Sequence, residues 1–376
     1  MSNSSLSGNS ATYGGLYIYE NFTKTIDLYN TIIVDSIGGA DCLVTGADNI
    51  RNNVINLIAD GSCNQGANVS NFQSGDPNLG TLGAYGGPVA GTSAITEAVR
   101  TMPLLPGSIA LDAGDAGTCP TTDQRGMPRH QTCDIGAFES QGFNLTTSSG
   151  DNQSTVIANA FVDPISVLVS ANNVVEPVGP DGVIHFSAPT SGASLTTTTH
   201  VTTTDASGLA SVSVQANDID GSYIVTATTL GASAPVSFTL RNLGYYTVTV
   251  GTDGSGSGTV ELDPPGGVYP DGQVVTVTAS AGAFSSFSSW SGSLSGTTTP
   301  VTLTVDSDKV VTGTFALLTY PLSVTIGGNG SGVIALEPPG GVYEHGTVVT
   351  LTANAELGST FVSWSGDVAG ETTPVT

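Results

Sequence analysis

Short runs in which hydrophobic and polar residues alternate recur along most of the chain. In "VVTVTA" (274–279) and "VVTLTA" (348–353) every second residue is valine, leucine or alanine, and threonine fills most positions between them. This period of two places one set of side chains on each face of a β-strand. The segments "SGLASVSVQA" (207–216), "GSYIVTATT" (221–229) and "APVSFTLRN" (234–242) show the same alternation, with turn residues between them. The pattern predicts an all-β protein built from short strands.

One pattern near the C-terminal end occurs twice. Residues 263–302, which begin "DPPGGVY", align without a gap with residues 337–376, which begin "EPPGGVY". The repeat predicts two copies of one small β-rich module. Because a small module needs large apolar side chains to fill its core, we expect four aromatic residues to be core residues rather than a sugar-binding platform. They are Tyr269 and Trp290 in the first copy and Tyr343 and Trp364 in the second.

The two copies differ in how far they extend. The first continues through "LTVDSDKVVTGTFA" (303–316), whereas the second reaches Thr376 before the equivalent segment. We expect that the last strands of the second copy were either cut from this sequence or are supplied by another chain. An open sheet edge can recruit a strand from a neighbouring chain, so assembly into an extracellular fibre by strand exchange is one hypothesis.

The N-terminal part has a different pattern, in which short apolar strands such as "NTIIVDS" (30–36) lie between Gly and Asn turns. Short strands that end in sharp turns are what a stacked parallel β-helix needs. The close-set alternating strands that follow predict a β-sandwich of about 100 residues. We therefore expect four modules: a β-helix part with its cap (1–141), a sandwich (142–243), a first repeat (244–317) and an incomplete second repeat (318–376).

Composition narrows the possible functions. Charged residues make up only 10% of the chain and its formal net charge is −24, which would repel nucleic acid. Hydrophobic residues make up 39%, enough to build cores. No run of apolar residues is long enough to span a membrane, and "MSNSSLSGNS" (1–10) lacks the features of a signal peptide. An acidic β-protein of this kind fits the cell surface or the extracellular space, and we expect the export signal to lie upstream of this fragment.

The four cysteines are Cys42, Cys63, Cys119 and Cys133. An even number within one region predicts two disulfides in an oxidising compartment. Of the three possible pairings, the local one joins Cys42 to Cys63 and Cys119 to Cys133. Zinc binding is the alternative, although no CxxC or HxxxH spacing supports it.

Several N-terminal motifs resemble a known bacterial group. "NTIIVDS", "LLPGSIALDAGD", "DQRGMPR" and "CDIGAFE" resemble the C-terminal part of choice-of-anchor or polymorphic-outer-membrane-like right-handed β-helix proteins. The resemblance covers roughly residues 1–140. It implies a pectin-lyase-like fold and a surface or secreted protein with no established catalytic constellation.

Later motifs resemble stalk modules. "GVIHFSAPTSGAS", "TDASGLASVSVQA" and "GSYIVTAT" resemble the bacterial Ig-like domains of invasins and intimins, and "PPGGVY", "VVTVTA" and "WSG" resemble InlB-type B-repeats. Both resemblances imply parts of larger adhesin-like proteins, and a shared fold does not by itself establish function.

The stretch "DQRGMPRHQTCDIGAFE" (123–139) holds two of the seven Lys and Arg residues of the chain. As an active site, its acids would have to face one another across a groove, as in a glycosidase, or bind calcium beside an arginine, as in a polysaccharide lyase. As a structural clasp, its arginines would donate hydrogen bonds to carboxylates and carbonyls and so close the last coil of the β-helix. The position of the acids in turns at the end of the predicted β-helix favours the clasp. Its expected members are Asp123, Arg125, Arg129, Asp134 and Glu139.

Two pairs of acids among small residues are candidate Ca²⁺ ligands: Asp112 with Asp115, and Asp306 with Asp308. Neither pair follows the spacing of an EF-hand loop or of a calcium-binding nonapeptide repeat. We therefore expect no cofactor, with Ca²⁺ as the one alternative.

These patterns predict a non-enzymatic secreted or cell-surface protein, structural or adhesin-like, whose β-helix is displayed on a stalk of β-modules. The expected partners are other copies of the chain, other surface proteins or glycans. The alternative hypothesis is a polysaccharide-active, pectin-lyase-like enzyme or a glycan-binding protein. That alternative depends only on the predicted β-helix and its acids.

Overall fold

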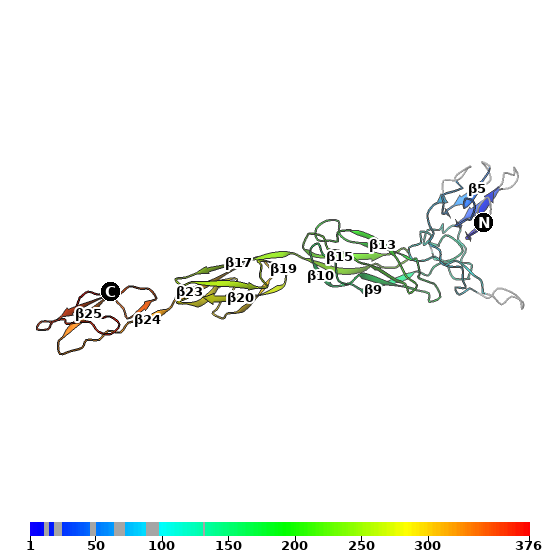
Figure 1. Cartoon of the computed structure of the whole chain (residues 1–376). Helices are drawn as coiled ribbons and strands as arrows, with labels where there is room; N and C mark the ends of the chain where they lie inside the picture. The colour runs from blue at the N-terminus through cyan, green and yellow to red at the C-terminus, as the bar shows by residue number, and fades with distance from the viewer. Residues whose placement is uncertain (11–14, 19–24, 46–49, 64–71, 88–97, 131) are drawn as a thin grey trace. The chain divides into compact units, whose positions relative to one another are not determined.

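The computed structural model describes residues 1–376 apart from 11–14, 19–24, 46–49, 64–71, 88–97 and 131. The described residues form strands, turns and loops, and no α-helix is found among them. The all-β class expected from the sequence is therefore confirmed. The chain divides into two compact units, Met1–Leu243 and Gly244–Thr376 (Figure 1).

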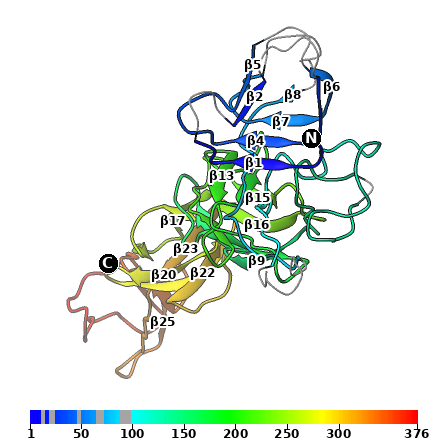
Figure 2. The ribbon, with the colours of Figure 1, turned by 90° about the vertical axis from the view of Figure 1, so that its right-hand side faces the viewer.

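Unit 1 begins with short parallel strands. One parallel sheet has the order β1 (Ser5–Ser7), β4 (Ile32–Val34), β7 (Asn56–Ile58), β8 (Phe72–Gln73). Two further parallel pairs join β2 (Leu16–Ile18) to β5 (Cys42–Val44) and β3 (Ile26–Tyr29) to β6 (Ile50–Val54). Figure 2 shows β1, β4 and β7 lying one above another.

The sequence explains why these strands are short. Asn30 and Asp35, which flank β4, have φ values of 46° and 58°. Asn and Asp tolerate this left-handed conformation better than other non-glycine residues, so the chain can turn sharply on both sides of the strand. All three residues of β4 are buried, so both faces of the strand are covered. This explains why β4 is apolar throughout, whereas apolar and polar residues alternate in the strands of the sandwich.

The segment from Ser74 to Gln141 contains no strand of its own among its described residues, only isolated bridges such as Gly83 with Thr101. Its buried side chains nevertheless belong to a larger core. Leu104, Ile135 and Phe138 pack in one hydrophobic cluster with Ile32 and with residues of the following sandwich. Unit 1 therefore has a core that runs from the parallel strands through this segment into the sandwich.

The sandwich consists of two sheets. The larger has the order β10 (Gln153–Val156), β16 (Val236–Leu243), β15 (Gly221–Thr228), β12 (Val183–Ser187), β13 (Thr199–Thr203), and the smaller has the order β14 (Leu209–Val212), β11 (Ile165–Ala171), β9 (Phe143–Ser149). Pairing is antiparallel except between β10 and β16. Tyr223, Val225 and Ala227 of β15 point into the core while Ile224 is exposed, as the alternation predicted.

Unit 2 contains the two sequence repeats. Repeat 1 has a four-stranded sheet, β19 (Val268–Pro270), β17 (Tyr245–Asp253), β23 (Lys309–Leu317), β21 (Ser285–Gly292), and a three-stranded sheet, β18 (Gly258–Asp263), β20 (Gln273–Ala281), β22 (Val301–Val305). Val275, Trp290 and Phe315 are buried between them. The strand β23 lies in the middle of the first sheet and supplies much of this core.

Repeat 2 forms two strand pairs only: β24 (Thr319–Pro321) with β26 (Val342–Glu344), and β25 (Gly332–Glu337) with β27 (Thr350–Ala355). Leu351 is its only buried hydrophobic residue in the described structure. Tyr343 and Trp364 are half-buried, whereas their counterparts Tyr269 and Trp290 are only 4% and 3% exposed. The expectation that all four aromatic residues are core residues therefore holds for repeat 1 and needs correction for repeat 2, where no strand occupies the place of β23.

Candidate functional site

The charged stretch singled out in the sequence folds into a turn that one aspartate stabilises. The backbone N–H of Asp123 donates to the carbonyl of Met127, and Oδ1 of Asp123 accepts hydrogen bonds from the backbone N–H groups of Arg125 and Met127 at 2.8 and 3.0 Å. Gly126 occupies the turn with φ 83°, a conformation that favours glycine. The turn directs the side chain of Arg125 into the protein.

Arg125 lies at the centre of a buried cluster. Its side chain has no exposed surface and donates to Asp123 Oδ2 at 2.8 Å, to the Glu139 carbonyl at 2.5 Å and to the Tyr85 carbonyl at 3.0 Å. Its guanidinium also contacts Glu176 Oε1 at 3.3 and 3.4 Å and lies 3.5 Å from the centre of the Phe138 ring. Because the guanidinium carries five donors in a fixed plane, one such residue can join several segments at once.

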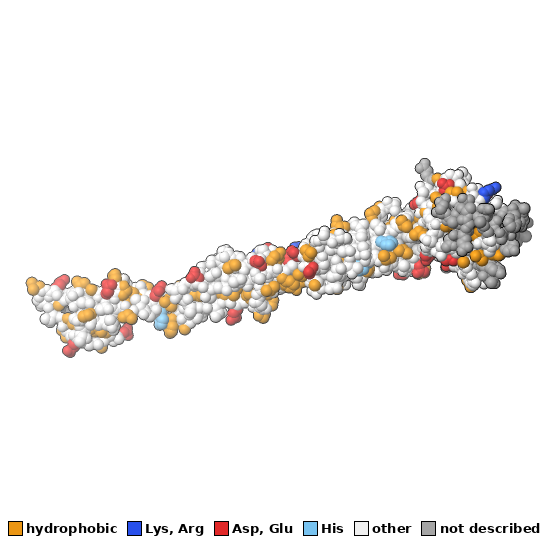
Figure 3. All heavy atoms as spheres, turned by 90° about the horizontal axis from the view of Figure 1, so that it is seen from above, with side chains coloured by type: hydrophobic (Ala, Val, Ile, Leu, Met, Phe, Trp, Pro, Cys, Tyr) orange, Lys and Arg blue, Asp and Glu red, His pale blue; other side chains and the backbone are white. Residues whose placement is uncertain are grey.

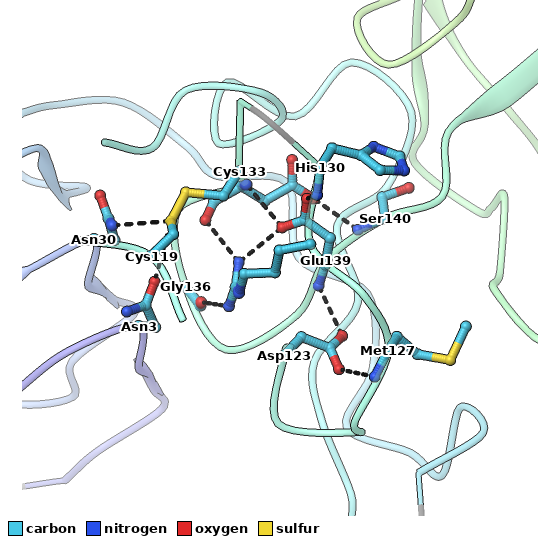
Figure 4. Close-up of polar contacts among 12 residues, drawn as sticks. Asn3, Asn30, Cys119, Asp123, Met127, His130, Cys133, Gly136, Glu139 and Ser140 are labelled. Carbon is cyan, nitrogen blue, oxygen red and sulfur yellow. Dashed lines mark hydrogen bonds and ion pairs between the residues drawn. A yellow bond between two sulfur atoms is a disulfide. The ribbon is translucent and has the colours of Figure 1, made fainter. Parts of the chain in front are cut away.

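Glu139, which is labelled in Figure 4, forms the second half of the cluster together with Arg129. Nη1 of Arg129 donates to Glu139 Oε2 at 2.7 Å, and the same carboxylate accepts the backbone N–H groups of His130 and Asp134, both at 2.9 Å. The side chains of Arg129 and Glu139 are 2% and 0% exposed. The carboxyl of Asp134 in turn accepts the backbone N–H groups of Asp112 and Ser140.

Burial acts on the acids of this cluster. It raises the pKa of Asp134 well above its usual 3.8, and the nearby Glu139 carboxylate adds to the rise. Burial also raises the pKa of Glu176, although its hydrogen bonds and Arg125 act in the opposite direction. Both shifts have the sign that desolvation gives to a carboxyl group.

The cluster also contacts the parallel strands. The side-chain amide of Asn30 donates to the carbonyl of Asp115 and to Thr118 Oγ1, and the backbone N–H of Asp115 donates back to Asn30 Oδ1 at 2.8 Å. The backbone N–H of Gly136 donates to the Asn30 carbonyl, and that of Ala137 donates to Ser5 Oγ. The charged stretch is therefore bonded to β1 and to the turn that precedes β4.

Disulfides reinforce this arrangement. Cys42 is bonded to Cys63 and Cys119 to Cys133, the local pairing that the sequence favoured. The Cys119–Cys133 bond closes the loop that carries both arginines. The expected clasp residues thus come together, and their role in closing the end of a β-helix stays a prediction. Arg125 of this set donates to Glu176 of the sandwich, and the neighbouring Ala137 donates its backbone N–H to Ser5 of β1.

The sequence did not indicate Glu176 or Ser140 as members of the cluster. Glu176 comes from the sandwich, and its Oε2 accepts hydrogen bonds from Ser140 Oγ and from the backbone N–H of Gln141. It lies 51 positions from Arg125 in the sequence. Only the fold brings the two together, so no local pattern could have identified the pair.

Two of the four candidate calcium ligands bond to protein groups of repeat 1. Asp306 forms an ion pair with Lys309, and Asp308 Oδ1 accepts hydrogen bonds from the backbone and the hydroxyl of Thr247. Across the part of the chain that the structure describes, no set of three or more His, Cys, Asp or Glu residues could hold a metal ion. On the face shown in Figure 3, acidic side chains lie scattered and basic ones are rare.

The arrangement can join segments, but it offers no route to a substrate. Its charged side chains are 0–2% exposed, and they bind one another and the backbone. Within the described residues no helix is long and apolar enough to cross a membrane.

The solved structures that are similar to this chain include an invasin and a pilin. One is the crystal structure of invasin, a bacterial integrin-binding protein, with 13% sequence identity and a TM-score of 0.21; the match covers 58% of this chain and 48% of that one. The chain thus spans about half the length of the invasin structure. The other is the major pilin protein T-13 from Streptococcus pyogenes serotype GAS131465, with 7% identity and a TM-score of 0.19, covering 48% of this chain and 97% of that one.

No curated protein matches the chain. Within unit 2, residues 246–318 and 320–376 each match the divergent InlB B-repeat domain family. The internal repeat found in the sequence therefore corresponds to two consecutive matches to one known domain family.

Proposed function

We propose that this chain is a non-enzymatic part of a bacterial cell-surface or secreted protein, with a structural or adhesin-like role. The observation that carries the proposal is the burial of the charged cluster. The charged residues that the sequence offered for an active site, among them Arg125, Arg129 and Glu139, are closed off from solvent and bonded to protein groups. A catalytic acid or base must instead reach the atom it protonates or deprotonates.

Two further observations support this role at the level of architecture. The parallel ladder β1–β4–β7–β8, with its sharp turns at Asn30 and Asp35, supports a pectin-lyase-like β-helix for the N-terminal part. The two-sheet sandwich supports an Ig-like module next to it, and the family matches support B-repeats in unit 2. In this proposal the β-helix is displayed on the other modules as on a stalk.

The two disulfides support an extracellular location, because disulfides persist in oxidising compartments. Antibodies raised against unit 2 should label intact, unpermeabilised cells, and protease added to such cells should remove the epitope. A signal seen only after permeabilisation would end the proposal.

The partners in this proposal are surface proteins, glycans or other copies of the chain, which would join by strand exchange into fibres. The polysaccharide-active alternative has a direct assay. The purified chain, incubated with polygalacturonate or alginate with and without Ca²⁺, should form no unsaturated or reducing ends. Formation of such ends would overturn the non-enzymatic role.

A further inference from the structure

Within unit 2, the backbone passes from repeat 1 to repeat 2 through a single residue, Leu318. Strand β23 ends at Leu317 and β24 begins at Thr319. The Leu318 N–H donates to the carbonyl of Phe284 in repeat 1 at 2.8 Å, and the Leu318 carbonyl accepts the His345 N–H of repeat 2 at 2.9 Å. Each backbone group of Leu318 is therefore bonded to one of the repeats, and no residue is left as a spacer between them.

Two aromatic rings meet beside this connection. Phe284 comes from the segment between β20 and β21, and His345 from the segment between β26 and β27. Their ring centres are 3.8 Å apart and the ring planes differ by 9°, so the rings are stacked. The Tyr320 ring of β24 lies edge-on to the His345 ring, with centres 5.9 Å apart. His345 thus has an aromatic neighbour in each repeat.

Phe284 has a strained backbone that the core of its own repeat does not explain. Its φ is 55°, a left-handed conformation that is an outlier for a bulky side chain. Its side chain is 53% exposed and lies outside the described hydrophobic core around Trp290 and Phe315. Strain of this kind persists only where the surrounding structure imposes it, and it is a reason to look for a function of the residue.

Comparison of the two repeats shows that neither ring is needed to form its own turn. In repeat 2 the position of Phe284 is occupied by Gly358, which has a φ of 90°. In repeat 1 the position of His345 is occupied by Asp271, whose backbone N–H makes the equivalent hydrogen bond. Two positions at which the repeats differ therefore face each other across the connection.

We propose that Phe284 and His345 form a latch that fixes repeat 2 against repeat 1, so that the two modules act as one stiff segment. Modules joined by a small contact move relative to one another by default. Here the backbone at Leu318 is one tether and the aromatic stack is a second, and two tethers restrict bending that one alone would permit. This inference rests on the proposed function, because it names what would stiffen the stalk between these modules.

Two substitutions open the latch while keeping residues that the repeats already use. Phe284→Gly introduces the residue that repeat 2 has at this position, and His345→Asp introduces the residue that repeat 1 has. An aromatic pair changes an equilibrium by roughly twofold to tenfold, so each variant should raise the population with an open joint by that factor. The double variant should have no larger effect than either single one, because each already removes the stack.

Distances between two spin labels on the full chain measure this population. All four native cysteines form disulfides, so cysteines introduced at two exposed positions, Thr304 of repeat 1 and Ala335 of repeat 2, can be labelled selectively. Pulsed electron paramagnetic resonance should give one narrow distance distribution in the parent and an additional broad component in both variants. Val274→Ala is the matched control: it shortens an apolar side chain of repeat 1 that is 52% exposed, and it should leave the distribution unchanged.

Hydrogen exchange distinguishes a latch from a role of Phe284 within its own repeat. Glycine adopts a positive φ without the steric cost that phenylalanine has. The amides of β20 and β23 in Phe284→Gly should therefore exchange at the same rate as in the parent or more slowly. A side chain that stabilised repeat 1 itself would give the opposite result.

Three results would overturn the inference. The first is a broad distance distribution in the parent. The second is a parent-like distribution in both Phe284→Gly and His345→Asp. The third is faster exchange throughout repeat 1 in Phe284→Gly, because Phe284 would then serve its own module. Labelling of intact cells does not depend on this contact, so failure here would leave the proposed surface location standing.

Discussion

At the scale of single residues, the charged cluster is held together by partners that lie far apart in the sequence. Glu176 is 6% exposed, and it bonds to the guanidinium of Arg125 and to Ser140 and Gln141. We expect Glu176→Ala to lower the free energy of unfolding of unit 1 by about 3 kcal/mol, because removing one partner of a buried ion pair leaves the other charge poorly compensated. The remaining bonds of Arg125 to Asp123 and Glu139 keep the loss at the lower end of the usual range.

Denaturant unfolding followed by circular dichroism measures this loss. Asp218→Ala, which removes an exposed acid of the same sandwich, is the matched control and should change stability by less than about 0.5 kcal/mol. Equal effects of the two substitutions would show that the contact between Glu176 and Arg125 adds nothing to stability.

The raised pKa of Asp134 predicts how the stability of unit 1 depends on pH. Its pKa is raised in the folded protein, so the folded state keeps a proton that the unfolded chain releases. Its contribution to stability is therefore full below about pH 4 and falls as the pH rises toward the folded pKa. An asparagine at this position cannot titrate, so the stability of Asp134→Asn relative to the parent should improve as the pH rises through that window.

Unfolding curves collected from about pH 4 to 8 would measure the trend. At any one pH, the stability difference between Asp134→Asn and the parent also includes a loss, because the new side-chain amide N–H would face a backbone N–H donor. Only the change of this stability difference with pH therefore tests the prediction. Asp163→Asn, at an exposed position, is the control: its stability relative to the parent should not show the same change with pH. A flat difference for Asp134→Asn would contradict the raised pKa.

At the scale of elements, the loop between Cys119 and Cys133 carries Asp123, Arg125 and Arg129, and none of its described residues belongs to a strand. Replacing both cysteines by serine should lower the stability of unit 1 by about 3 kcal/mol, because a closed loop of this length restricts the unfolded chain by roughly that amount. Amide exchange within residues 120–129 should become faster in the variant. Unchanged stability and exchange would mean that hydrogen bonds alone order the loop.

The sequence predicted elements best where a strand has one buried face. Residues 221–228 alternate in sequence and alternate in burial, because the period of a strand fixes which side chains point inward. The grouping of Arg125, Arg129 and Glu139 was also predictable, since a short loop and a local disulfide keep them close. The part of Glu176 in the cluster was not predictable, because its partner Arg125 is distant in the sequence. The partial exposure of Trp364 was not predictable either, because it depends on whether a strand occupies the place that β23 holds in repeat 1.

At the scale of the whole molecule, the two units differ in the groups by which their unfolding can be perturbed or followed. Both disulfides lie in unit 1, and both tryptophans lie in unit 2. The units have separate hydrophobic cores in the described structure. A chain with separate cores need not unfold in one step, so a single midpoint would not describe it.

Reduction should therefore act on one unit only. Dithiothreitol removes the restriction that the disulfides place on the unfolded form of unit 1, so the circular dichroism transition of that unit should move to lower denaturant concentration by an amount equivalent to several kcal/mol. The tryptophan fluorescence transition of unit 2 should keep its midpoint. The cysteine-to-serine variant of both pairs, measured without reductant, provides the control and should reproduce the shift. A parallel shift of the fluorescence transition would show instead that the stability of unit 2 depends on folded unit 1, and the two units would then have to be treated as one cooperative structure.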